Sequence, residues 1–485
     1  MENITIPSRD KHWSRFHAVL SLLILGFYAL CLYVPERWLD LYNSYGKLLL
    51  ISMCALCFWY TGFRGCLERK LVIAYALWFF VSRLLNTDIY LQNELDMTIS
   101  RFLCAALLTT CLALDGEDRR RFLDGVFIVY CGIFFVAVLI GLYCSLVGCY
   151  ITLPPEGMIF GMDNYDFYRF INYLCMFNTN RTISCVWVFL AICLTSYEFF
   201  RCRKTLWRVI VGIMWLVFFA GMSITFSRTV NVAFCVSGGM LGLLLGIRHL
   251  KTERKALRVL ILVLITIGSM LASYVGLTVT QKLLHSVSEI VSVSVDRQSD
   301  SIVTYYENAD SSFSDPRLEE GLTEASDLNG RGDIYRAAIA AIRQNPKILL
   351  RGSYTFKLMD PVNAVIQNYI IPYKHVHNYL LQVLLLTGLP GLLIVVAFTV
   401  LLVVRMIRLF FAKDSTVPFC AKLLIMPVAG ILIYSMLEIC IFTNPADIRA
   451  ISTDLRELMF FLLSGAVLAY SAEASSKRRT DAGSV

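Results

Sequence analysis

Three short segments of the sequence carry residue types that can bind a phosphate group or transfer a proton. They contain Arg228, Arg331 and His377. A guanidinium presents a planar pair of donors that matches two phosphate oxygens, and it keeps its charge. A histidine titrates near neutral pH and can act as a general base. These three residues are therefore candidates for a site that binds a phosphate or diphosphate and moves a proton.

Each of these residues also has a purely structural explanation. Arg228 stands between two apolar segments, where an arginine commonly extends to lipid phosphate. Arg331 starts a helical segment, whose free N–H groups favour an anion, but an exposed loop arginine often has no ligand. His377 can be a polar cap where the chain re-enters an apolar segment. Local spacing does not separate these explanations from a functional role.

The elements that must position these residues are membrane-spanning helices. Of the 485 residues, 57% are hydrophobic and 16% are charged, and many apolar blocks exceed the ~18 residues that distinguish a spanning helix from a buried one. We expect an all-α polytopic membrane protein with about twelve transmembrane helices. The segments are 16–34, 48–61, 71–85, 97–114, 122–147, 183–200, 209–225, 230–247, 259–279, 377–404, 419–442 and 455–470.

Clusters of Lys and Arg fall at every second connection between these segments. The positive-inside rule places such clusters in the cytoplasm, so we expect both termini inside and the chemistry on the extracytoplasmic face. The net charge of +8 is thus explained by topology, and we expect no nucleic-acid partner. The clusters are Arg64–Lys70, Arg119–Arg121, Arg201–Arg208, Arg248–Arg258, Arg405–Lys413 and Lys477–Arg479.

The same pattern divides the chain into four parts. We expect nine transmembrane helices in residues 1–279, a large extracytoplasmic loop in 280–376, three further transmembrane helices in 377–472 and a basic cytoplasmic tail in 473–485. In the loop, Asp333 is the expected cap of an amphipathic helix over 334–344, whose expected apolar face is Ile334, Ala338, Ala341 and Ile342. The 16 cysteines lie almost entirely in or beside apolar blocks, and none lies between 282 and 376. We therefore expect neither a disulfide framework nor a metal site there.

Glu438 is a further candidate, near the outer end of a spanning segment. A carboxyl group at that depth is often functional. The favoured interpretation is nevertheless structural, with Glu438 paired to an internal arginine such as Arg83 or Arg101.

The three segments, in this order and on one expected face, resemble the O-antigen ligase and polymerase superfamily of bacterial membrane proteins. The family pattern of a histidine, then Asn or Ser, then a leucine and a Gly-x-x-Gly corresponds to His377, Asn378, Leu380, Gly388 and Gly391. Its Ser-Arg corresponds to Ser227 and Arg228. Its Arg-x-x-x-Trp corresponds to Arg331 and Tyr335, with tyrosine in place of tryptophan. Its Asn-Pro-Asn resembles Asn178, Thr179 and Asn180, without the proline. The resemblance covers residues 178–392 by motif and the whole chain by topology.

The resemblance implies a GT-C-like glycosyltransferase of the bacterial inner membrane. Its donor would be a glycan on undecaprenyl diphosphate and its acceptor a hydroxyl of a glycan or lipid-glycan, among membrane lipids and with neither metal nor other cofactor. Arg228 and Arg331 would stabilise the leaving diphosphate. His377 would activate the acceptor hydroxyl or assist the diphosphate. The expected substrate-binding residues are Tyr335, Asn378, His375, Asn180 and Glu438.

Two alternatives stay open at this point. Motifs that a ligase and a polymerase share do not distinguish the two. A transporter or flippase of lipid-linked glycans would need a polar path with several intramembrane charges or paired broken helices. The sequence offers chiefly Arg83, Arg101 and Glu438 for such a path.

Overall fold

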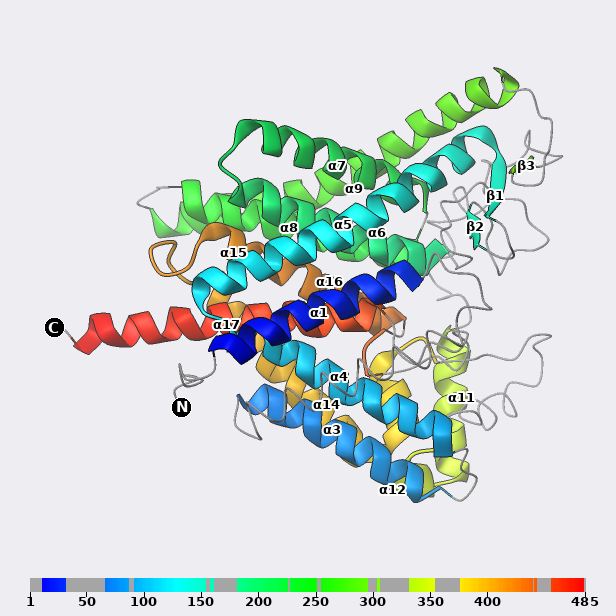
Figure 1. Ribbon diagram of the computed structural model, residues 1–485, viewed down its shortest axis with the longest axis vertical. Coiled ribbons are helices and arrows are strands. Elements are labelled where there is room, and N and C mark those ends of the chain that lie inside the picture. Colours follow the sequence, from blue (N-terminus) through cyan, green and yellow to red (C-terminus); the bar gives the residue numbers. More distant parts are fainter. Residues whose placement is uncertain are drawn as a thin grey trace.

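The computed structural model describes residues 11–31, 66–86, 91–153, 158–160, 181–225, 227–250, 254–294, 303–305, 331–353, 376–438, 440–442 and 455–483. Long helices form a bundle, and most of the shorter elements lie at one end of it (Figure 1). The long helices are α1 (Lys11–Cys31), α3 (Leu67–Leu84), α4 (Leu91–Ala113), α5 (Gly116–Val147), α6 (Arg181–Arg201), α7 (Thr205–Ile224), α8 (Arg228–His249), α9 (Lys255–Ser294), α14 (Tyr379–Phe410), α16 (Ile425–Leu437) and α17 (Leu455–Gly483). The shorter elements are β1 (Cys149–Leu153), β2 (Met158–Phe160), β3 (Val303–Tyr305), α11 (Arg331–Gln344), α12 (Lys347–Arg351) and α15 (Phe419–Leu423).

The polytopic membrane architecture expected from hydropathy is confirmed. Within the described ranges, nine helices are long and apolar enough to cross a membrane. Helices lie over eleven of the twelve expected segments, and the expected segment 48–61 lies outside the described residues. The total of twelve spans therefore stays a prediction. The all-helical expectation needs one addition, because β2, β1 and β3 pair in that order as a small antiparallel sheet.

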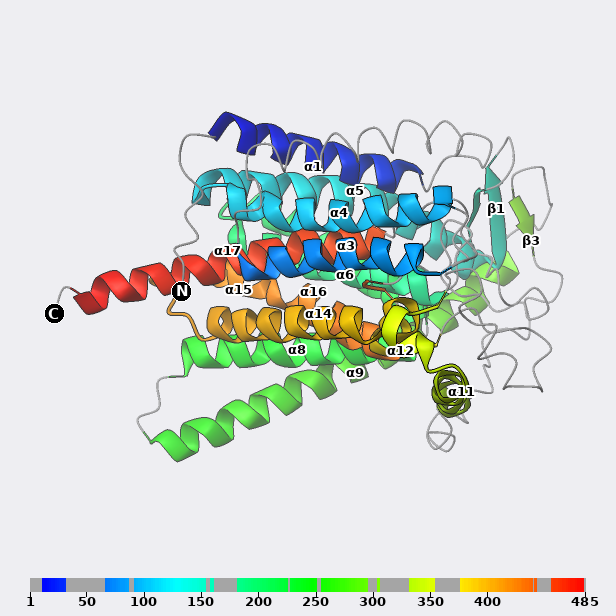
Figure 2. The same ribbon diagram turned by 90° about the horizontal axis from the view of Figure 1, so that it is seen from below.

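The basic connections lie at the same end of the bundle as the start of α1 and the end of α17 (Figures 1 and 2). Ion pairs join these connections to each other. Arg119 of α5 pairs with Glu473 of α17 at 2.5 Å, and Arg201 at the end of α6 pairs with Asp124 of α5 at 2.9 Å. The sheet, α11 and α12 lie at the opposite end. The described residues of the basic clusters therefore lie together at one end of the bundle.

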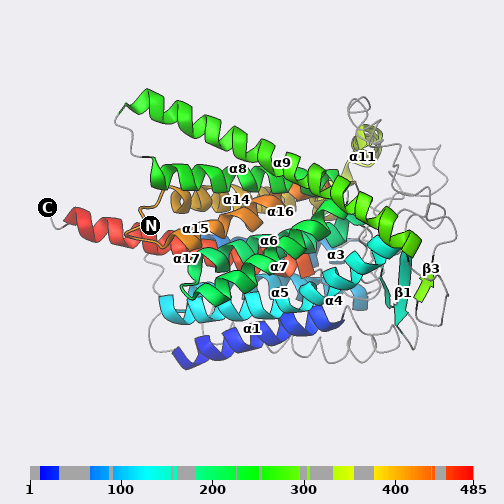
Figure 3. The ribbon, with the colours of Figure 1, turned by 90° about the horizontal axis from the view of Figure 1, so that it is seen from above.

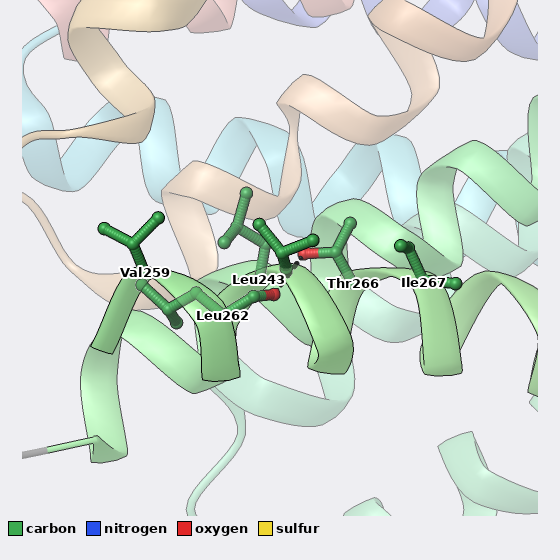
Figure 4. Close-up of a pocket in the computed structure, with 6 residues that line it drawn as sticks. Leu243, Val259, Leu262, Thr266 and Ile267 are labelled. Carbon is green, nitrogen blue, oxygen red and sulfur yellow. Dashed lines mark hydrogen bonds between the residues drawn. The ribbon is translucent and has the colours of Figure 1, made fainter. Parts of the chain in front are cut away.

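Helix α9 packs closely along α8 and exposes most of its outer surface (Figure 3). Glycines of α8 permit this approach, because a Cβ at Gly238 or Gly242 would lie 2.1 Å from a serine Oγ of α9. Small residues serve this purpose between membrane helices. An open apolar groove of about 370 Å³ lies between the same two helices (Figure 4). Its lining includes Leu243, which lies about 22 Å along α8 from Arg228 at 1.5 Å per residue, so the groove is remote from Arg228.

Two helix boundaries differ from those expected. Helix α9 continues beyond residue 279 to Ser294, because its polar later turns remain helical outside the apolar stretch. Helix α11 begins at Arg331, so Asp333 is not its cap; it lies in the first turn and pairs with Arg336 at 2.6 Å. An acidic residue in a first turn is favourable for the helix dipole as well. The four-part division of the chain remains a prediction.

Candidate active site

The chain enters α14 through a constrained junction at residues 376–378. His377 has a φ of 51°, in the left-handed region that is unfavourable for a residue with a Cβ. The side chain of Asn378 caps α14 by accepting a hydrogen bond from Leu381 N at 3.0 Å. Val376 N donates to the buried Gln382 Oε1 at 3.1 Å. A non-glycine residue in this conformation costs about 1–3 kcal/mol, and such residues cluster at functional sites.

Glu438 connects this junction to the loop helix α11. It follows directly on α16, and its carboxylate accepts from Arg331 Nη2 through Oε1 at 2.6 Å. Its other oxygen, Oε2, lies 2.8 Å from His377 Nδ1. The three side chains are 14–24% exposed, so the cluster is shielded but reachable from solvent. One carboxylate therefore holds two of the candidate residues in a single group.

Tyr335 adds a fourth member to this group. It lies one turn after Arg331 on α11, and its hydroxyl donates to the backbone carbonyl of His377 at 3.1 Å. Burial raises the pKa of Tyr335 above its usual value of 10, while the charge of Arg331 lowers it. The phenol thus keeps its proton over the physiological range and supports the constrained backbone of His377.

A separate apolar cluster fixes α11 against the first part of α14. It includes Ile334, Ala338, Ala341 and Ile342, the apolar face expected from the sequence. It also contains Ala337 of α11 and residues of α12, the junction and α14, namely Ile348, Val376, Leu385 and Leu386. This cluster is distinct from the main core of the bundle. Arg331, Tyr335 and His377 are therefore carried by one packed unit.

The two glycines of the Gly-x-x-Gly pattern each have a steric reason. Helix α14 is broken at Gly388, which has φ 72°, and a Cβ there would lie 2.8 Å from Leu349 O. A Cβ at Gly391 would lie 2.0 Å from Thr387 Oγ1 and 3.2 Å from Trp78. Only glycine allows both the left-handed conformation and the close approach of α12.

Arg228 lies at the same end of the bundle as Glu438. It is the exposed first residue of α8, and α8 runs antiparallel to α16, with Ser237 Oγ 3.5 Å from Met426 O. From that contact, Arg228 lies about 13 Å along α8 and Glu438 about 18 Å along α16, at 1.5 Å per residue. The structure thus places Arg228 and Glu438 at the same end of the bundle.

The remaining sequence-derived candidates divide into three cases. The side-chain amide of Asn378 donates to Met436 O at 3.0 Å, beside the group. His375 and Asn180 lie outside the described residues. The expected pairing of Glu438 with Arg83 or Arg101 is wrong.

Nearer partners explain that correction. Arg101 pairs with Glu457 at 2.5 Å deep in the bundle, and Arg83 donates to Ser353 O. Glu438 instead pairs with Arg331 and His377.

Sequence reasoning missed Gln382 and Trp78. Gln382 is a buried amide in an apolar helix, a signal that could have marked it. The indole of Trp78 donates to Thr387 O at 2.7 Å, a contact between helices far apart in the sequence that no local pattern reveals.

The charged group lies where helix α11 meets the end of the bundle opposite to the basic connections. A histidine held at Nδ1 by a carboxylate presents its other nitrogen, Nε2, for proton transfer, and a nearby arginine can stabilise an anion. The class defined by fold and site is thus a polytopic membrane protein with an acid, a histidine and an arginine in one interfacial group.

The comparison with known families agrees with this class. The family described as O-antigen ligase matches residues 211–396. The match confirms the resemblance to the O-antigen ligase and polymerase superfamily, whose members act in polysaccharide biosynthesis at membranes. The matched range contains Arg228, Arg331, Tyr335 and His377, whereas Glu438 lies beyond it. No curated protein matches the chain.

Proposed function

We propose that this protein transfers a glycan from undecaprenyl diphosphate to an acceptor hydroxyl at the extracytoplasmic face of a bacterial inner membrane. The O-antigen ligase family supports a transferase of this general type. The observation that carries the proposal is the carboxylate of Glu438, which contacts both Arg331 and His377 Nδ1. The acid orients the histidine through Nδ1, and we assign to Nε2 the role of accepting the proton.

The reaction then balances without a metal. The acceptor O–H gives its proton to His377 Nε2, and its oxygen forms a bond to the anomeric carbon of the donor sugar. The bond from that carbon to the diphosphate oxygen breaks, and the electron pair leaves with the lipid diphosphate. Arg228 and Arg331 stabilise this charge. Arg331 has five N–H donors and the hydrogen bond to Glu438 uses one of them, so the others can serve the diphosphate.

The proposed orientation follows from the basic end of the bundle. The positive-inside rule assigns that end to the cytoplasm, together with the start of α1 and the end of α17. The group around Glu438 lies at the opposite end and would face outward.

The test is glycan transfer by the purified protein in lipid nanodiscs. The donor is total polyprenyl-diphosphate-linked glycan extracted from the native membrane, supplied with excess EDTA. Released lipid diphosphate and product size are measured for wild type, Arg228→Ala, Arg331→Ala and His377→Ala. Arg336→Ala is the matched control for the loop helix, because Arg336 is 81% exposed and pairs with Asp333 of the same helix.

Release by wild type and by Arg336→Ala, with loss in the three variants, supports the proposal. A ladder of lengthened glycans then indicates a polymerase, and a single addition to a different acceptor indicates a ligase. Transfer by the variants at the wild-type rate refutes the assigned residues. Passage of labelled lipid-linked glycan across a liposome membrane without transfer replaces the proposal with the transporter alternative.

A further inference from the structure

The break in α14 leaves backbone carbonyls without their helical donors. In an unbroken helix each carbonyl accepts from the N–H four residues later. The left-handed Gly388 interrupts this ladder, and Pro390 has no N–H to give to Leu386. Carbonyls freed inside a membrane protein need donors from elsewhere, because lipid supplies none.

Two of these donors come from outside α14, and both depend on α3. The indole Nε1 of Trp78 donates to Thr387 O at 2.7 Å. The backbone N–H of Ser353 donates to Leu385 O at 2.7 Å. Arg83, on the same helix as Trp78, donates in turn to Ser353 O. Helix α3 therefore holds the segment 379–387, the part of α14 before the break, at its end near Thr387.

His377 lies just before the other end of this segment, where α14 begins. Residues 379–387 span about 13 Å at 1.5 Å per residue. A tilt of about 5° at the break moves the start of this segment by about 1 Å, a displacement that can cost a hundredfold in rate. Such a tilt would also shift α11, since both belong to the apolar cluster around Ile334 and Leu385.

We propose that Trp78 is a positioning residue for the active site, acting through Thr387 on the orientation of the segment that carries His377. The expected effect of Trp78 on turnover rests on the proposed function, whereas its expected effect on the orientation of residues 376–387 does not. Trp78 lies outside the range that the O-antigen ligase family matches. Gly391 allows the indole to approach, because a Cβ there would lie 3.2 Å from Trp78 Cδ1.

The experiment replaces Trp78 with phenylalanine, which keeps an aromatic ring but removes the donor. Trp215→Phe is the matched control, since Trp215 is also half-buried and its indole donates to Ser196 Oγ at 3.2 Å away from the site. Hydrogen–deuterium exchange of residues 376–387 is measured by mass spectrometry in nanodiscs. Turnover and KM are measured with the extracted lipid-linked glycan. Trp78→His, whose ring N–H can still donate, is the second variant.

We expect Trp78→Phe to speed exchange in residues 376–387 by about tenfold and to lower kcat by about tenfold with little change in KM. Trp215→Phe should change neither, and Trp78→His should recover part of the protection. Faster exchange with an unchanged kcat would overturn the positioning role, as would unchanged exchange in Trp78→Phe. Should wild type transfer no glycan, the proposed function fails, and exchange alone decides whether Trp78 holds the segment. Should Trp78→Phe fail to fold, unprotected residues 376–387 in Trp78→His would count against the proposal.

Discussion

Replacing Glu438 by glutamine gives the sharpest test of the group described above. The amide keeps the shape of the carboxylate and removes its charge. In the wild type Glu438 Oε2 lies 2.8 Å from His377 Nδ1 and Oε1 lies 2.6 Å from Arg331 Nη2. The charge matters most when His377 has taken the acceptor proton, because the imidazolium then faces a carboxylate.

The size of the effect follows from this distance. Two unit charges 2.8 Å apart interact by about 6 kcal/mol at an effective dielectric constant of about 20. The side chains of His377 and Glu438 are 24% and 14% exposed, so solvent screens part of this energy. We therefore take about 2–3 kcal/mol as lost from the transition state in Glu438→Gln, which corresponds to a fall in kcat of about 30- to 150-fold.

The assay is the release of lipid diphosphate under saturating donor. Glu473→Gln serves as the control, because it also loses an ion pair, with Arg119, but at the opposite end of the bundle. A kcat of Glu438→Gln within threefold of wild type would refute the reasoning. A raised KM with an unchanged kcat would instead assign Glu438 to uniform binding of the donor.

Three further predictions follow from individual contacts. Tyr335→Phe should lower kcat about tenfold, because it removes the support of the His377 carbonyl, and the raised pKa of Tyr335 means that this advantage of the wild type persists to above pH 10. Gly388→Ala should lower Tm, since its φ is 72° and it is closely packed, whereas Gly268→Ala, with no atom within 4 Å, should leave Tm unchanged or raise it. Asp115→Ala should destabilise the protein by about 1 kcal/mol through the lost cap of α5. The hydrogen bond from the Asp118 N–H lowers the pKa of Asp115, so this difference is present at neutral pH and disappears as the pH falls below about 3.8.

Most of the long helices could be predicted because one physical signal governs them. Spanning helices must be long and apolar, and their basic flanks alternate in side, so hydropathy and charge locate most of them. The apolar face of α11 was also predictable, since Ile334, Ala338 and Ala341 follow helical spacing. The extension of α9 to Ser294 was not, because polar residues carry no hydropathy signal for where such a helix stops.

The partner of Glu438 could not be predicted for a different reason. Sequence indicates that a carboxyl near the outer end of a helix needs a cation, and the arginines considered, Arg83 and Arg101, were those of the spanning segments, whereas the partner Arg331 lies on the loop helix. The structure resolves the choice through the other acid. Glu457 pairs with Arg101 at 2.5 Å and also accepts from Phe442 N at 2.6 Å, so Arg101 is occupied inside the bundle. Pairing is thus a property of the whole set of charges, whereas motif reasoning treats each charge alone.

The residues of the charged group are carried by elements of two separate apolar clusters. Arg331 and His377 belong to a unit with its own small core, and Glu438 belongs to the bundle. The carboxylate of Glu438 therefore contacts the unit across the boundary between the two cores, and α3 holds the same unit from another side through Thr387. A group assembled across such a boundary depends on how the unit is seated. We therefore expect residues remote from the chemistry, such as Trp78, to influence the rate as well as residues beside His377, and Glu438 itself lies beyond the range that the O-antigen ligase family matches.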